Sequence, residues 1–100
     1  MIESNFNNGV LKIGLSGELD DKNAPIIRQE LDKLICSDGI KRVVIDMSKL
    51  DFMDSTGIGV LLGRYKKLIA RQISSFIYSP RGNVDKVLNL SGIYKLMPRI

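Results

Sequence analysis

Three consecutive polar residues, Asp54, Ser55 and Thr56, are the best placed for chemistry, because an apolar stretch with helical spacing follows them at once. Aspartate and serine side chains accept hydrogen bonds from the unpaired N–H groups of a helix's first turn, so the triplet predicts the start of a helix. A hydroxyl at that position is also well placed to carry a phosphate, since the helix dipole and the unpaired N–H groups stabilise an anion. Two interpretations are therefore open for the triplet, a structural helix cap and a site that carries a phosphate.

Several catalytic chemistries are excluded by composition and spacing. The chain contains no histidine, so a Ser-His-Asp triad cannot form, and Ser55 has no obvious base beside it. The stretch Asp54–Gly57 has one residue too many for the Asp-Thr-Gly or Asp-Ser-Gly loop of an aspartic protease, and it leads into a helix. Gly57 and Gly63 lack the spacing and the following Lys-Ser/Thr of a phosphate-cradling P-loop. No carboxylates have metal-ligand spacing, so we expect no enzyme, no cofactor and no metal site.

The element that must position the triplet is a helix from Asp54 to Arg71, indicated by apolar residues that recur every three or four positions. A glycine inside a helix costs roughly 1 kcal/mol relative to alanine. The small residues beside the buried face therefore serve either close internal packing or the close approach of a partner next to Ser55. The residues expected on the buried face are Ile58, Leu61, Leu62, Tyr65, Leu68 and Ile69. The small flank comprises Gly59, Gly63 and Ala70, and the residues expected to face outward are Val60, Arg64, Lys67 and Arg71.

The remaining elements alternate between strands and helices. Asn8-Gly9 predicts a hairpin turn, and the β-branched run Val43–Ile45 is typical of a central strand covered on both faces. The expected order is strands at 2–6 and 10–15, a helix from the Asn23 cap to Asp38-Gly39, a strand at 42–46, the helix at 54–71, a strand at 75–78, a short helix ending at Gly92, and an edge strand at Leu96-Met97. This order, β-β-α-β-α-β-α-β, predicts one α/β domain over residues 1–100, with helices packed on a mixed sheet of four to five strands.

Composition sets further bounds. The 100 residues carry a net charge of +4 and are 44% hydrophobic, as expected for one globular domain. The basic pairs Lys41-Arg42 and Lys66-Lys67 lack interleaved aromatic residues, so we expect solvated faces and no direct nucleic-acid binding. Cys36 is the only cysteine, which excludes an internal disulfide, and its apolar surroundings predict a core position. Neither a secretory signal nor a membrane span is evident, so we expect a cytoplasmic protein.

Three segments carry a family resemblance. Phe52–Lys66, FMDSTGIGVLLGRYK, resembles the signature of the STAS-domain anti-sigma-factor antagonists, most closely the stage II sporulation protein AA type. Gly17–Asp20 resembles the end of that family's second strand, and Ser91–Lys95 resembles its late Ser-Gly-aromatic-Lys region. In this order the three segments span nearly the whole chain.

The resemblance implies a regulatory binding module. In this family the unphosphorylated protein binds an anti-sigma factor that is also a serine kinase, which frees the sigma factor. The kinase phosphorylates the serine directly after the motif's aspartate, which falls on Ser55, and a serine phosphatase restores the binding form. The partner-binding residues implied in this way are Asp20, Asp54, Thr56, Gly57, Gly59, Val60 and Gly63.

Two departures from the family pattern accompany the resemblance. The family's usual C-terminal helix has no counterpart before Ile100, so we expect an uncovered sheet face and self-association as a homodimer or larger species. The usual glycine pair before the penultimate strand is missing around Arg71–Ile73. Two alternative functions stay open: a STAS scaffold or ligand-sensing module that is not phosphorylated, and a nucleotide-binding or nucleotide-hydrolysing domain that uses the same helix N-terminus.

Overall fold

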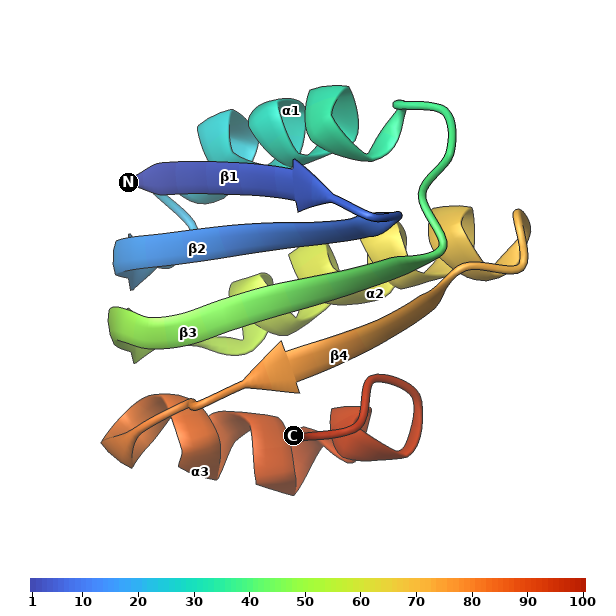
Figure 1. Cartoon of the computed structure of the whole chain (residues 1–100). Helices are drawn as coiled ribbons and strands as arrows, with labels where there is room; N and C mark the ends of the chain where they lie inside the picture. Colours follow the sequence, from blue (N-terminus) through green and yellow to red (C-terminus); the bar gives the residue numbers. More distant parts are fainter.

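The computed structural model describes all 100 residues and forms one α/β domain with a four-stranded sheet (Figure 1). The strands lie in the order β1-β2-β3-β4; β1 runs antiparallel to β2, and β2, β3 and β4 are parallel. The fold class and the order of the first seven elements are as predicted. The elements are β1 (Ile2–Asn7), β2 (Val10–Leu19), α1 (Ala24–Ile35), β3 (Arg42–Met53), α2 (Ser55–Ile69), β4 (Ser74–Tyr78), α3 (Gly82–Ser91) and a 3₁₀ helix (Ile93–Lys95).

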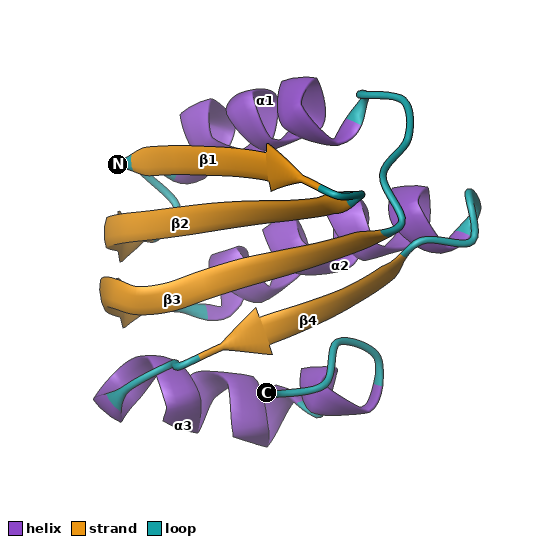
Figure 2. Ribbon diagram, viewed as in Figure 1, coloured by secondary structure: helices purple, strands orange, loops and turns teal.

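The sheet is covered on one face only. Helices α1 and α2 pack behind it, α3 lies along the β4 edge, and the face toward the viewer in Figure 2 is open. Burial alternates accordingly along the strands: Val43 and Ile45 are in the core, whereas Val44 between them is half-buried. The prediction that this run is covered on both faces is therefore wrong. The apolar sheet residues facing the core are Leu11, Ile13, Leu15, Leu19, Val43, Ile45, Met47, Leu50, Met53 and Ile77.

The predicted hairpin turn is confirmed, whereas the predicted start and end of the first helix differ from the structure. The Asn8-Gly9 turn is present, with both residues at positive φ, and it joins β1 to β2. Asn23 precedes α1, but its side chain does not cap the helix; Asn23 Nδ2 instead donates to the Glu18 carbonyl at 3.0 Å. The helix then ends at Ile35, before the predicted Asp38-Gly39 end.

Cys36 is a further correction. It follows the last residue of α1 and is exposed, not part of the core. The buried face of α1 ends with its last residue, Ile35, which lies in the core. The helical spacing does not continue to Cys36.

The expected last strand is replaced by a single bridge. Leu96-Met97 follows the 3₁₀ helix, and only Arg99 pairs with Ile77 of β4. Pro98 has no N–H to donate to a ladder; its carbonyl accepts from Ile77 N at 2.9 Å, and Ile100 N donates to the Ile77 carbonyl at 2.9 Å. The sheet therefore has four strands, and the expected self-association remains a prediction.

Gln72 occupies the place of the missing glycine pair. Its φ is +60°, a left-handed conformation usual for glycine, in the turn between α2 and β4. The turn forms without glycine, and β4 begins at Ser74, close to its predicted position. None of the helices combines the length and the hydropathy that a bilayer crossing requires.

Candidate functional site: the N-terminus of helix α2

Asp54 caps helix α2 and leaves Ser55 free. Asp54 has an extended backbone, and its Oδ1 accepts hydrogen bonds from the backbone N–H groups of Thr56 at 2.9 Å and Gly57 at 3.4 Å. Ser55 is exposed, and its side chain makes no hydrogen bond within the protein, while Thr56 is half-buried. The capping role expected of the triplet thus belongs to the aspartate, and the neighbouring hydroxyl is available to a partner.

The structure brings Asp20 next to Asp54. The two aspartates follow Leu19 and Met53, which are paired in register at the carboxyl ends of the parallel strands β2 and β3. The backbone N–H of Asp54 also donates to the Leu19 carbonyl at 3.4 Å. Asp20 Oδ1 accepts from the backbone N–H of Asn23 at 2.9 Å, which fixes the turn into α1. Asp20 and Asp54, two of the predicted partner-binding residues, therefore lie side by side at the carboxyl ends of these strands.

Gly57 has a packing role. A Cβ added at this position would lie 2.8 Å from Met53 Cγ and 3.0 Å from Leu19 Cγ. Only glycine lets the first turn of α2 approach the ends of β2 and β3 so closely, and the residue is buried. Val60 is also fully buried. The prediction that Val60 faces outward is therefore wrong, whereas partner contact at Gly57 and Val60 stays a prediction.

The outer face of α2 differs from the predicted one. The buried residues are Gly57, Val60, Leu61, Arg64 and Leu68, whereas Ile58, Leu62 and Tyr65 are half-buried and Ile69 is exposed. At about 100° per residue, the buried face is turned by about a quarter of the circumference from the expected one. Arg64 belongs to the interior because it meets Asp32 of α1, with Nε 3.0 Å from Oδ1.

Gly59 and Gly63 have no internal packing partner. An added Cβ would meet nothing within 4 Å at either residue. Of the two explanations for the small flank, close packing within the protein is therefore excluded for these glycines. Ser55, Gly59 and Gly63 follow one another at intervals of four residues and share one side of α2. We call these three residues the Ser55 stripe.

Asn83 is a site residue that the sequence analysis missed. It lies in the first turn of α3, and its Oδ1 accepts from the backbone N–H of Met53 at 3.1 Å, beside the α2 N-terminus. The nearby pair of Arg81 and Asp51, 3.9 Å apart, is exposed on both sides and contributes little. In the sequence, Asn83 is marked only by its place directly after Arg81-Gly82. That position does not predict that its side chain meets the end of β3.

Comparison with known proteins places the whole chain in one group. The family model described as the STAS domain matches residues 1–100. The anti-sigma F factor antagonist of Paenibacillus polymyxa is 36% identical over 97 residues, which are 97% of this chain and 83% of that protein. The solved structure of the anti-sigma factor antagonist SpoIIAA in its unphosphorylated form has a TM-score of 0.83 and 28% identity, covering 100% of this chain and 88% of that one. The structure of the Bacillus cell fate determinant SpoIIAA in the phosphorylated form has a TM-score of 0.74 and 27% identity, covering 100% and 91%.

Proposed function

Because this chain belongs to the STAS-domain family, we propose that it acts as an anti-sigma-factor antagonist, switched by phosphorylation of Ser55. The unphosphorylated chain binds an anti-sigma factor that is also a serine kinase, and this binding releases the sigma factor. A serine phosphatase acting on phosphorylated Ser55 restores the binding form. The role is binding, with no reaction catalysed by this chain. Support comes from the relatives named anti-sigma factor antagonists and from the likeness to SpoIIAA in both of its forms.

The observation that carries the proposal is the division of roles between Asp54 and Ser55. Because Asp54 satisfies the first free N–H groups of α2, a phosphate can be added to Ser55 without breaking the helix cap. The helix dipole tolerates a dianion at this end. Phosphorylation should therefore leave the fold intact and act at the surface.

The partner surface follows from the exposed residues. We infer that the kinase contacts the Ser55 stripe, with half-buried Thr56 beside it and Asp20 and Asp54 at its end. Gly59 and Gly63 give a smooth surface that a partner can approach closely. A phosphate of about −1.5 to −2 charges at one end of this surface repels acidic partner groups and resists desolvation.

Phosphopeptide mass spectrometry tests the assignment of the acceptor. The wild type, Ser55→Ala and Thr56→Ala are each incubated with the cognate anti-sigma kinase and ATP. We expect one phosphate on Ser55 in the wild type, none in Ser55→Ala, and wild-type incorporation in Thr56→Ala. The two hydroxyls differ in direction by about 100° around the first turn, so the kinase should distinguish them. Phosphate on Thr56, or wild-type incorporation in Ser55→Ala, would refute the assignment.

A further inference from the structure

A small polar hollow lies on the open face of the sheet, above Gly14 of β2. An added Cβ at Gly14 would meet only the Glu3 carbonyl, at 3.9 Å, and the residue has no positive φ. Neither close packing nor backbone conformation therefore requires glycine here, although glycine within a strand is destabilising by about 0.5–1 kcal/mol relative to alanine. The missing side chain leaves a hollow of about 70 Å³, which adjoins a shallower groove of about 210 Å³ toward Asn5 and Lys12.

A β-bulge in β3 brings additional side chains to this hollow. Gly14 pairs with Asp46 and Ser16 with Lys49, so two residues of β3 face the single Leu15 of β2. Met47 and Leu50 both point into the core, and the two residues between them both line the hollow. Bulges commonly redirect side chains next to functional sites. Here the bulge adds the Lys49 ammonium and the Ser48 hydroxyl to one wall.

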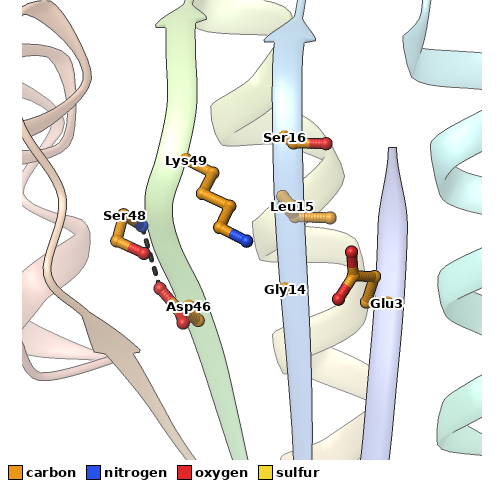
Figure 3. Close-up of a pocket in the computed structure, with 7 residues that line it drawn as sticks. All are labelled: Glu3, Gly14, Leu15, Ser16, Asp46, Ser48 and Lys49. Carbon is orange, nitrogen blue, oxygen red and sulfur yellow. Dashed lines mark hydrogen bonds between the residues drawn. The ribbon is translucent and has the colours of Figure 1, made fainter.

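Charges of both signs surround the hollow. Glu3 and Asp46 lie on opposite sides of Gly14 in the strand register. Figure 3 shows the Glu3 and Lys49 side chains reaching toward β2 from the two neighbouring strands, and neither forms an ion pair within the chain. Lys12 lies 3.8 Å from Asp46 Oδ2.

The Asp46 carboxylate is held in its charged form. Burial by itself raises the pKa of Asp46, but the hydrogen bonds from Ser48 and the charges of Lys12 and Lys49 outweigh it, so the pKa falls below its ordinary value. The backbone N–H of Ser48 donates to Asp46 Oδ1 at 2.9 Å. The hollow thus presents the carboxylates of Glu3 and Asp46 and the ammonium group of Lys49, with Lys12 in the adjoining groove, and these charges are complementary to a ligand with both signs.

We propose that the hollow binds a small zwitterion of the α-amino acid class. The ligand's ammonium group sits above Gly14 between the carboxylates of Glu3 and Asp46. Its carboxylate faces Lys49 and the hydroxyls of Ser16 and Ser48. The only apolar residue of the lining is Leu15, whose side chain is buried in the core, so the site favours glycine or serine over amino acids with large apolar side chains. This inference goes beyond the proposed function and shares no residue with the Ser55 stripe.

Amide NMR titration of the ¹⁵N-labelled full chain with glycine tests the proposal. Because Glu3 and Lys49 are exposed to solvent, we expect saturable shifts at Gly14, Ser16 and Lys49 with a dissociation constant of about 1 mM. Methylammonium and acetate, which each carry one of the two charges, should bind at least about tenfold more weakly. Absence of a saturable shift with glycine, or equal affinity for either single-charge probe, would overturn the proposal.

Variants of the hollow distinguish a site from a general surface effect. Gly14→Val places a branched side chain in the hollow, and its Cβ would meet only the Glu3 carbonyl, at 3.9 Å. Valine suits a strand, so this variant should fold normally and lose glycine binding. Lys49→Gln should weaken binding about tenfold by removing one charge-assisted contact. Lys86→Gln, at an exposed position on α3, is the matched control and should bind glycine like the wild type. Undiminished glycine binding by Gly14→Val would contradict the assignment even if the wild type binds.

Discussion

Arg64 is a charged residue of α2 that lies in the core, where its counter-charge comes from the neighbouring helix. The exposed fractions of the Arg64 and Asp32 side chains are 7% and 32%, and Nε lies 3.0 Å from Oδ1. The angle is not that of a hydrogen bond, so the attraction is electrostatic, and Arg64 Nη1 has no partner. Lys67 also approaches Asp32, at 3.0 Å, but remains half in solvent. This carboxylate therefore fixes how α2 lies against α1.

Removing the Asp32 charge should destabilise the protein. Asp32→Asn leaves the buried Arg64 guanidinium without a counter-charge, and because Asp32 is partly exposed we expect a loss of about 2 kcal/mol, below the value for a fully buried pair. Urea unfolding measures the difference. Lys67→Gln, which removes only an exposed partner of Asp32, is the control and should change stability by less than about 0.5 kcal/mol. Equal effects of the two substitutions would show that Arg64 does not depend on this ion pair.

Single residues differed in how well sequence alone could place them. Asp54 and Ser55 were predictable because helix capping depends on local chemistry, and the family signature singled out the serine. The role of Gly57 was not predictable, because the 2.8 Å approach to Met53 arises only when the helix packs on the strand ends. Arg64 was placed outward because an isolated charge normally is, and its partner is 32 residues away in the chain.

At the scale of elements, α2 links the core to the proposed partner surface. Its predicted extent, 54–71, agrees with Ser55–Ile69 to within two residues at each end. Its orientation was harder to predict, because apolar residues extend around more than half of the helix and periodicity alone leaves the centre of the buried face undetermined. The observed orientation directs the Ser55 stripe away from the core.

Gly59 and Gly63 should make the protein less stable than alanine would, while keeping the surface open to a partner. Gly59→Ala and Gly63→Ala should each raise the free energy of unfolding by about 1 kcal/mol, because no neighbour lies within 4 Å and alanine favours a helix. Gly63→Leu should also fold normally but weaken binding to the anti-sigma kinase. Thermal unfolding and calorimetric titration measure the two effects. A lower thermal midpoint in the alanine variants would indicate a packing role and remove the support for a partner surface.

At the scale of the whole molecule, the sheet separates two surfaces. The carboxyl ends of the parallel strands carry Asp20 and Asp54 at one end of the sheet, whereas the hollow above Gly14 lies on the open face.

The C-terminal segment is held to α3, where the hydroxyl of Tyr94 donates to Asp85 at 2.6 Å. Burial and this carboxylate raise the pKa of Tyr94 well above its ordinary value, so the hydroxyl stays protonated and keeps donating.

Much of the chain order could be predicted because each strand and helix has its own local pattern of turns and apolar spacing. The one-sided cover of the sheet could not, since Val43–Ile45 has the same composition as a strand buried on both faces. The predicted edge strand at Leu96-Met97 is absent, because Pro98 has no N–H with which to continue a ladder there. The polar hollow depends on a register shift between β2 and β3, which is a property of the paired strands and not of either sequence segment.

The most direct test compares the affinities of the unphosphorylated chain and the Ser55-phosphorylated chain for the cognate anti-sigma factor. Calorimetric titration should show tight binding only for the unphosphorylated form, with affinity reduced at least about tenfold by the phosphate, equivalent to 1.4 kcal/mol or more. The thermal midpoints of the two forms should agree within about 4 °C, because the charge sits at the exposed end of α2 and its cap is Asp54. Equal affinities of the two forms, or a loss of binding that coincides with unfolding, would contradict a phosphorylation switch at the surface.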